Sequence, residues 1–484
     1  MMGNQKLSNT KVVKAGIGYT VGNYLLKGFS FITVPIFARM MTTDDFGIYS
    51  TFVAYETILF IILGCAFHSS YNSAKTKYDI NNDNPKLSYP GYISVTIEII
   101  IINTVILLLT GILFSSFLSP LLGLSRIQIV LLVLYSFATA VITCYNTNAS
   151  INYDYMSYIK VAGLNAVLNL SVSIILMLTI FNTQRYMGRI IGTVLPMFII
   201  SAVIAINFLR EKKPGNRKIY AKWGLKYSVP IVFHGLSQVI LSQFDRIMIR
   251  NMIGDTAAGI YSFGYTVFSI INVTFTSLDS VWVPWFYKCR RNNELDSIKK
   301  YSSIYAIGIL VLCICLMLAC PELIIVLGSA KYVEAQYCTI PIVASGFFVF
   351  LYTLPSCVEY YHEKTSYIAI ATTFAAGMNV ILNYYFILKY GYIAAAYTTL
   401  FTYILYFLVH YIIARKIEKM FLFSNRIILF CSAAVITAMI IALKTIKYVF
   451  IRWILVILVF CIFIYYEEKE LGAIKLIYKK IQKR

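Results

Sequence analysis

The sequence predicts an all-α, polytopic integral membrane protein with about 14 transmembrane helices. Of its 484 residues, 59% are hydrophobic and only 13% are charged, whereas soluble domains average about 45–50% apolar and about 25% charged residues. The apolar residues form continuous runs of membrane-spanning length, and the basic residues gather on alternate breaks between these runs. A chain with so few polar side chains cannot cover a water-facing surface, so we expect it to lie in a bilayer.

The apolar runs give the expected elements in chain order. A hydrocarbon core of about 30 Å requires roughly 20 helical residues, and barrel strands would instead alternate polar and apolar residues over about ten positions. The first run follows a polar, lysine-containing segment without a cleavage-site pattern, so we expect it to be retained as a helix. The expected spans are 15–41, 46–72, 90–117, 125–149, 156–181, 186–209, 226–250, 256–285, 301–327, 334–358, 366–388, 391–414, 426–444 and 448–466.

The net charge of +21 indicates orientation. Of the 42 lysines and arginines, 29 fall in segments on the side of the N-terminus, and these are 1–14, 75–86, 210–226, 288–300, 364, 415–426 and 469–484. Cytoplasmic loops carry the excess of Lys and Arg, so both termini are expected in the cytoplasm. The bases are dispersed over loops and accompany no nucleic-acid-reading motif, so we expect no nucleic-acid partner.

Two short segments recur at nearly the same separation. Gly47-Ile48-Tyr49-Ser50 returns as Gly259-Ile260-Tyr261-Ser262, and Ala162-Gly163-Leu164-Asn165-Ala166-Val167-Leu168-Asn169 returns as Ala376-Gly377-Met378-Asn379-Val380-Ile381-Leu382-Asn383. The offsets are 212 and 214 residues, six spans in each case. We therefore predict two parallel six-helix lobes, 1–215 and 216–418, then two further spans over 419–466 and a basic cytoplasmic tail over 467–484. Parallel repeats of this kind are a transporter architecture with the substrate site at the repeat interface.

Lys27 is the most telling charged residue within a predicted span. An ionisable group near the bilayer centre costs at least about 2.5–3.5 kcal/mol, which makes it a candidate for function. Lys27 belongs to a polar stripe at helical spacing, formed by Thr20, Asn23, Lys27 and Ser30. We expect it to line a cavity and attract an anionic group; the alternative is a lysine that pairs with Glu56 or snorkels to the membrane surface.

The seventh predicted span carries a comparable polar stripe, formed by His234, Gln238, Ser242, Asp245 and Arg246. Asp245 and Arg246 point about 100° apart on a helix, and a structural tie between helices is the alternative to a functional role. Arg189, which opens the sixth span, is either a phosphate ligand or an interfacial anchor. Glu56, Glu98 and Asp279 are candidate proton or sodium carriers, and His234 is either a packing residue or a proton relay.

The sequence lacks the motifs of several common enzyme and metal-binding chemistries. No GxxxxGK[ST], GxSxG or HExxH motif occurs, so nucleotide hydrolysis by a P-loop and two common hydrolase mechanisms are excluded. The ten cysteines form no CxxC pair and the four histidines are scattered, so we expect no metal site and no cofactor beyond Na⁺ or H⁺ as a coupling ion. Loops between the spans are too short for a catalytic domain, and we therefore expect no enzyme.

The motifs of both halves resemble those of a known transporter family. These motifs are Ala15 to Asn23 with Lys27-Gly28, Pro35, Arg39 and Asp45-Phe46-Gly47-Ile48-Tyr49, then Gly188-Arg189-Ile190, Asp245 to Ile249 and Trp282-Val283-Pro284. Over residues 12 to 415 the chain is similar to bacterial O-antigen and capsule repeat-unit flippases. They form the Wzx-like, polysaccharide-transport branch of the MOP superfamily, which also contains MATE exporters and the lipid II flippase.

The resemblance implies a MATE-like fold and a substrate. It implies two lobes that alternate access to a central cavity and move undecaprenyl-diphosphate-linked oligosaccharide to the outer leaflet of the bacterial inner (cell) membrane. The expected partners are this lipid-linked oligosaccharide, membrane lipids, a polysaccharide polymerase and a chain-length regulator. The expected phosphate-side cations are Lys27, Arg39, Arg189 and Arg246, and the expected coupling-ion residues are Glu56, Asp245 and Asp279.

Two other functions compete with this interpretation. A MATE-type multidrug cation antiporter would favour a carboxylate-dominated cavity, whereas Lys27 favours an anion. A membrane-embedded polysaccharide polymerase or ligase would require a long outer loop with catalytic Arg or His residues, and the expected outer loops are short.

Overall fold

The computed structural model describes residues 33–80, 87–211, 216–420 and 422–471, together with residues 18, 22, 28 and 29. The chain packs as two compact units, Met1–Thr256 and Ala257–Arg484. The lobe boundary expected from the repeat, at residue 215, differs from this division by packing and stays a prediction. Lys27 and the rest of its polar stripe, Thr20, Asn23 and Ser30, lie outside the described residues.

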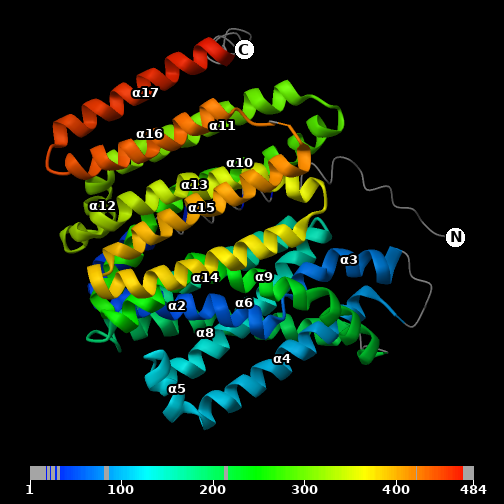
Figure 1. The fold of residues 1–484 in the computed structure, drawn as a ribbon. Coiled ribbons are helices and arrows are strands. Elements are labelled where there is room, and N and C mark those ends of the chain that lie inside the picture. Colours follow the sequence, from blue (N-terminus) through cyan, green and yellow to red (C-terminus); the bar gives the residue numbers. More distant parts are fainter. Residues whose placement is uncertain are drawn as a thin grey trace, which may run out of the picture. The chain divides into compact units, whose positions relative to one another are not determined.

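The described residues contain helices and no strand (Figure 1). Up to the junction of the units the elements are α2 (Thr43–Gly64), η1 (Phe67–Ser70), α3 (Tyr71–Lys75), η2 (Thr76–Ile80), α4 (Tyr89–Leu113), α5 (Ser115–Leu122), α6 (Arg126–Ile151), α7 (Tyr155–Leu178), α8 (Arg185–Glu211) and α9 (Arg217–Met252). After these come α10 (Asp255–Arg291), α11 (Leu295–Leu318), α12 (Cys320–Gly328), η3 (Ala330–Ala335), α13 (Gln336–Tyr361), α14 (Thr365–Tyr390), α15 (Ile393–Glu418), α16 (Asn425–Lys444) and α17 (Val449–Leu471). The all-α prediction is confirmed.

Twelve of the described helices are long and apolar enough to cross a membrane: α2, α4, α6, α7, α8, α10, α11, α13 with η3, α14, α15, α16 and α17. The predicted span 226–250 forms part of α9, a helix of 36 residues that is not among the twelve. Its His234, Gln238 and Asp245 interrupt the apolar run and lower its hydropathy. The first predicted span, 15–41, lies mostly outside the described residues. Its described part includes residues 33–40, which are helical.

Two predicted spans are divided by breaks that hydropathy does not reveal. The run 46–72 ends as a helix at Gly64, because Cys65 and Ala66 adopt left-handed φ angles of 46° and 48°, a conformation that stops a helix. The run 301–327 is divided at Ala319 into α11 and α12. Apolar residues continue through both breaks, so hydropathy misses them; left-handed backbone marks the first, and Pro321 in the first turn of α12 marks the second.

Local capping fixes several helix starts. Thr42 and Asp45 form a capping box at α2, and Ser125 and Gln128 form another at α6, so that each pair satisfies backbone N–H groups that the helix leaves unpaired. The repeated tetrapeptides occupy equivalent places, since Gly47 and Gly259 are each the fifth residue of their helices, α2 and α10. This position agrees with the predicted placement of both segments at helix starts.

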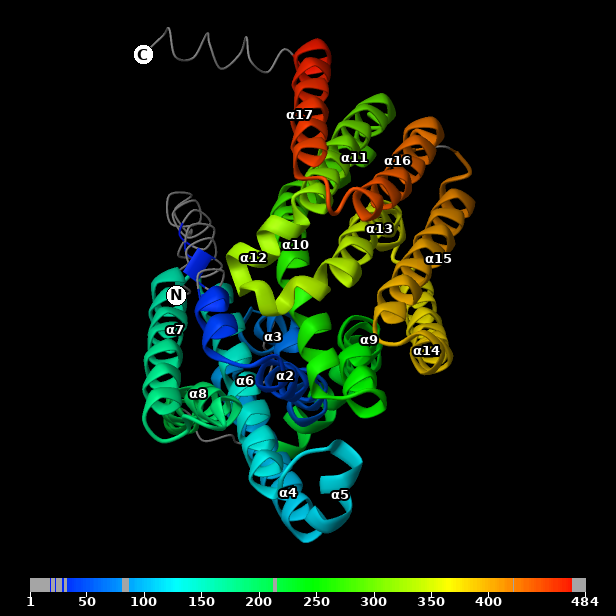
Figure 2. The same cartoon turned by 90° about the vertical axis from the view of Figure 1, so that its left-hand side faces the viewer.

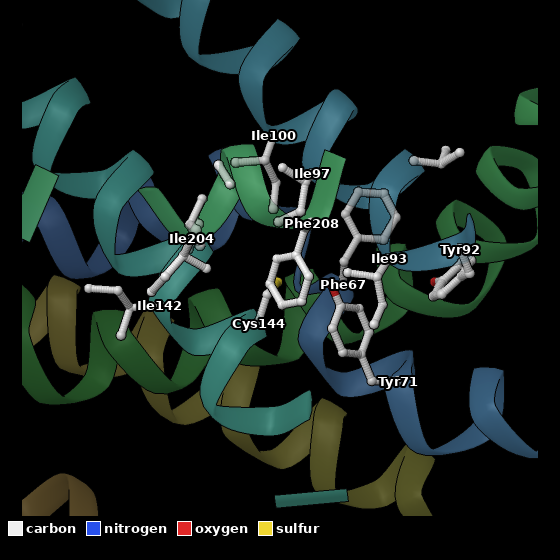
Figure 3. Packing of buried hydrophobic residues seen from close by; sticks show 14 of the residues in the cluster. Phe67, Tyr71, Tyr92, Ile93, Ile97, Ile100, Ile142, Cys144, Ile204 and Phe208 are labelled. Carbon is white, nitrogen blue, oxygen red and sulfur yellow. The ribbon is translucent and has the colours of Figure 1, made fainter. Parts of the chain in front are cut away.

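The first unit is held together by an aromatic and aliphatic core between α4, α6, α8 and the short helices after α2. Figure 3 shows Ile93 and Phe208 beside Phe67 and Tyr71 near its centre, with Tyr92 on the right-hand side of the view. Hydroxyl groups buried with these rings are paired: Tyr71 with Thr96 at 2.8 Å and Ser70 with Tyr92 at 2.6 Å. The unit thus pairs the hydroxyl groups of Tyr71 and Tyr92 inside its core, whereas that of Tyr78 has no partner among the described residues.

The second unit is built around α13, whose membrane-length segment is the most deeply buried of the twelve. Helices α14 and α15 run beside it (Figure 1), and α11, α16 and α17 form a neighbouring group (Figure 2). α13 packs most extensively against α15. Polar side chains on this pair are therefore the ones most fully removed from solvent and lipid.

Candidate functional site

The arginine at the start of α8 is the best-positioned of the predicted cations. A Gly188-x-x-x-Gly192 spacing brings the backbone of α8 against α7: a Cβ atom added at Gly192 would lie 2.4 Å from the Cα atom of Ser173. Small residues spaced in this way allow two membrane helices to approach closely. The approach places Arg189 beside α7, where its Nη1 donates to the side chain of Asn169 and, at 2.9 Å, to Ser173 Oγ.

Two aromatic rings hold the flat faces of the same guanidinium group. Its Cζ atom lies 3.7 Å from the ring centre of Phe37 and 4.9 Å from that of Tyr49, which are cation–π distances. Both hydrogen bonds leave from Nη1, so the Nε–Nη2 edge makes none within the described part of the chain. Arg217 and Arg290 use this edge to bind Glu98 and Glu418 bidentately. Arg189 is thus half-buried, fixed in orientation and able to bind an anion.

Glu56 lies in the same neighbourhood of the first unit. It is 4% exposed on α2 and interacts with Thr139 of α6. Its Oε1 has no hydrogen-bond partner among the described residues. Tyr135 lies within electrostatic range of both Glu56 and Arg189, so a predicted coupling acid and a predicted phosphate-side cation act on the same ring.

The remaining predicted residues of the first unit lie on other elements. Arg39 is exposed near the end of the helical segment 33–40, and Arg246 is half-buried on α9. Asp245 is 1% exposed, and its Oδ1 accepts the backbone N–H of Arg246 at 2.9 Å. A hydrogen bond within α9 therefore occupies part of the Asp245 carboxylate.

Asp279 is the predicted coupling residue that falls in the second unit. It lies half-buried on α10 and accepts a hydrogen bond of 3.3 Å from the Tyr305 hydroxyl of α11. The same hydroxyl lies 3.2 Å from the backbone oxygen of Phe275. Glu98, another candidate from the sequence, forms a bidentate salt bridge with Arg217, whose side chain is 65% exposed. That pairing is typical of a surface contact.

The repeated asparagines gain roles that sequence spacing alone does not supply. In the first unit Asn169 binds Arg189. In the second unit its counterpart Asn383 accepts from the hydroxyl of Thr398 and donates to Asn379 Oδ1 at 3.0 Å. The repeat therefore carries one asparagine per half that joins a pair of consecutive long helices, half-buried at Asn169 and buried at Asn383. The recurrence of the octapeptide was the signal that could have identified them.

Three buried ionic contacts of the second unit were missed by the sequence analysis. His410 pairs with Glu359, Arg452 with Glu322, and Arg290 with Glu418. The partners lie 51, 130 and 128 residues apart, so no local pattern identifies them. No group of three or more His, Cys, Asp or Glu residues in the described part of the chain could hold a metal ion.

Solved structures of membrane transporters share this fold. The lipid II flippase MurJ, in its inward closed conformation, aligns with a TM-score of 0.67 over 94% of this chain and 99% of its own, at 18% identity. An inward-facing multidrug resistance MATE transporter of the MOP superfamily aligns with a TM-score of 0.59 over 81% of this chain and 98% of its own, at 14% identity. The MATE-like architecture expected from the resemblance is confirmed.

Comparisons of the sequence identify the family. A membrane protein of Methanocaldococcus jannaschii is 24% identical over 48% of this chain and 57% of its own length, so the match spans a little over half of that relative. A protein of the Lsg locus of Haemophilus influenzae is 20% identical over 59% of this chain and 68% of its own. The model of the polysaccharide biosynthesis protein family matches residues 12–290. The chain is therefore a multi-pass membrane protein that belongs to the polysaccharide biosynthesis protein family.

Proposed function

We propose that this protein is a flippase for undecaprenyl-diphosphate-linked oligosaccharide repeat units. It moves them by alternating access from the cytoplasmic to the outer leaflet of the bacterial inner membrane, with both of its termini in the cytoplasm. The product enters surface polysaccharide synthesis, such as that of O-antigen or capsule, together with a polymerase and a chain-length regulator. The family and the solved neighbours contain flippases and transporters rather than enzymes.

The observation that carries the proposal is the open edge of Arg189. A diphosphate presents paired oxygen atoms that match the two parallel N–H groups of a guanidinium edge. The edge is held in place by Asn169, Ser173, Phe37 and Tyr49, so little conformational freedom is lost when a phosphate binds. Low-dielectric surroundings strengthen such a contact. The prenyl chain requires no polar site, because it can remain in lipid.

Reconstitution tests this proposal directly. The full-length protein is placed in liposomes that contain a polyprenyl-diphosphate-linked oligosaccharide with a fluorescent label, and dithionite then quenches the label in the outer leaflet only. We expect the wild-type protein to make the protected pool accessible, and Arg189→Ala to slow this step about 10–100-fold. This range corresponds to about 1.5–3 kcal/mol for a hydrogen bond to a charged group.

Two matched variants and one competing substrate sharpen the result. Arg189→Lys keeps the charge but loses the planar fork, and we expect an intermediate rate. Arg217→Ala removes a surface arginine that uses the same edge, and we expect the wild-type rate. Equal rates for wild type and Arg189→Ala would contradict the assigned role of Arg189. Export of a cationic dye without any movement of the lipid would replace the proposal by the multidrug antiporter.

A further inference from the structure

Two ionisable side chains of the second unit meet where neither water nor lipid reaches them. Glu359 lies near the end of α13 and His410 lies on α15, and both side chains are 0% exposed. His410 Nδ1 is 2.6 Å from Glu359 Oε1. The imidazole ring stacks on Tyr352 at 5.7 Å between ring centres and contacts the edge of Tyr406 at 4.5 Å. The pair is therefore enclosed by aromatic rings.

Each member of the pair has one atom left over. Glu359 Oε2 and His410 Nε2 are buried and have no hydrogen-bond partner among the described residues. With neutral histidine the pair carries a charge of −1, and uptake of one proton makes it neutral as imidazolium and carboxylate. Burying an unmatched charge costs more than burying a matched pair, so the gain or loss of a proton changes how well the surrounding helices accommodate this pair. A buried site whose net charge changes in this way can be linked to helix movement.

A second pair on the same two helices leads outward. His362 Nε2 of α13 lies 3.0 Å from Glu418 Oε1 of α15, and Glu418 also binds Arg290 of α10 bidentately. The His362 side chain is 33% exposed and that of Glu418 is 2% exposed, so exposure falls from the end of the helices towards the inner pair. The residues of the two pairs are offset by three positions at the end of α13 and eight on α15, about 5 and 12 Å along the axes.

No other described titratable group around the inner pair, Glu359 and His410, is a better candidate for proton exchange near neutral pH. Tyrosines titrate near pH 10 in water, far above neutrality. Asp279 of α10 accepts a hydrogen bond from Tyr305 and acts electrostatically on Tyr352, and Arg290 is matched by Glu418. The groups that face the pair or its immediate neighbours are Tyr352 and Tyr360 of α13, Tyr403 and Tyr406 of α15, and Tyr287 and Asp279 of α10. Histidine is the one whose charge ordinarily changes between about pH 5 and 8.

We propose that Glu359 and His410 form a one-proton site in the second unit, and that proton movement through this site drives the transport cycle. The second part of this proposal, the coupling of the proton site to transport, rests on the flippase function proposed above. Loading adds one proton to the pair and changes its charge from −1 to 0, without any other bond made or broken. A metal ion is disfavoured because Na⁺ and other hard cations prefer several oxygen ligands, whereas this site offers one carboxylate and one imidazole.

The proton site is tested on the full-length protein without any substrate. The chain has only four histidines, so ¹⁵N-histidine labelling in lipid nanodiscs gives few solid-state NMR signals, and the His410→Gln variant identifies that of His410. We expect the His410 signal to change from neutral to protonated between about pH 9 and pH 5, and Glu359→Gln to shift this transition. A His410 signal that stays constant across the range would overturn the proposal. The pH dependence of the His410 signal is measured on the wild-type protein, so it does not require either variant to be active.

The coupling is tested in liposomes that contain the labelled lipid diphosphate. With the membrane potential clamped at zero, one proton per substrate predicts that a gradient of one pH unit changes the steady-state leaflet ratio about tenfold. We expect Glu359→Gln and His410→Gln to lose this response yet still equilibrate the lipid between leaflets. The matched variant His68→Gln, in the first unit, should respond as wild type does.

The two experiments separate the possible failures. A full gradient response in Glu359→Gln and His410→Gln would overturn the coupling. A wild-type protein that moves no labelled lipid would remove the flippase function and the coupling with it, whereas the NMR signal of His410 would still decide whether the pair binds a proton.

Discussion

Individual buried charges in this protein are of two kinds. The Glu418 carboxylate accepts from Arg290 through both of its oxygen atoms, as buried ions must if they are to be stable. Glu56 and the Glu359–His410 pair each keep an oxygen or nitrogen atom without a partner among the described residues. Groups of the second kind are costly unless they exchange a ligand or a proton, which makes them the better candidates for function.

Variants of Lys27 and Glu56 test whether Lys27 is a cavity cation or the partner of a buried carboxylate. We expect Lys27→Ala to abolish export of the lipid-linked glycan while the protein remains in the membrane, because the cavity loses a cation for the diphosphate. We also expect the double variant Lys27→Ala with Glu56→Gln to stay inactive. Surface glycan and the amount of membrane-inserted protein are measured together.

The double variant also tests the alternative, in which Lys27 pairs with Glu56. If Lys27 served only to neutralise Glu56, removing both charges would restore export, because no uncompensated buried charge would remain. Restored export in the double variant would therefore contradict the cavity role of Lys27 and favour a structural ion pair.

The last helix depends on one ionic contact for its position in the second unit. Arg452 of α17 is 1% exposed and donates to both carboxylate oxygens of Glu322 at 2.6 Å and to the backbone oxygen of Leu318 at 2.6 Å. Few other residues of α17 are buried. Lipid contributes little to selecting a position for an apolar helix, so this contact is expected to determine where α17 packs.

The two partners of this contact differ in exposure, and the difference predicts unequal mutants. Glu322→Ala leaves Arg452 buried without a counter-charge, which costs about 3–5 kcal/mol. Arg452→Leu leaves Glu322, whose side chain is 30% exposed and can be hydrated. We therefore expect Glu322→Ala to lower the thermal midpoint of the purified protein more than Arg452→Leu does.

The double variant with leucine at both positions should recover part of the loss, since well-packed apolar residues often replace a buried ion pair without cost. Glu98→Ala is the matched control, because it breaks the exposed pair with Arg217, which contributes about 0–1 kcal/mol. A larger loss for Arg452→Leu than for Glu322→Ala would contradict the assignment of Arg452 as the costly partner.

For the chain as a whole, helix length and charge together predict orientation. α10 has 37 residues and is about 55 Å long at 1.5 Å per residue, well beyond the roughly 30 Å of hydrocarbon. Its last turn carries Lys288, Arg290 and Arg291. Basic helix ends of this kind are typical of the cytoplasmic side, so we expect this end of α10 to lie there.

Reporter fusions check this orientation. A cytoplasmic reporter fused after Lys218 should be active, because the segment 210–226 is the most basic break between spans. A reporter that is active only in the periplasm should respond after Lys331, which lies in η3 before α13. The opposite pair of signals would reverse the predicted topology.

The sequence by itself determined the fold class, the number of spans to within the first helix and α9, and the internal repeat. These features depend on sums and recurrences along the chain, since the apolar content of about 20 consecutive residues decides whether a helix is stable in lipid. The same local sums could not locate the breaks at Cys65 and Ala319, because apolar residues continue through both. Left-handed backbone at Cys65 and Pro321 just after Ala319 mark them instead. The local sums did identify Arg189, Glu56 and Asp279 as costly groups, without their partners.

Only the tertiary structure decided which of those groups meet. Glu359 and His410 were invisible as a pair because they lie 51 residues apart on helices separated by α14. Asn169 and Ser173 can bind Nη1 of Arg189, and so leave its Nε–Nη2 edge without a hydrogen bond in the described part of the chain, because Gly188 and Gly192 let α8 approach α7 closely. Such pairings depend on how each helix is rotated about its axis against its neighbours. Packing between distant segments sets that rotation, and hydropathy along the chain does not contain it.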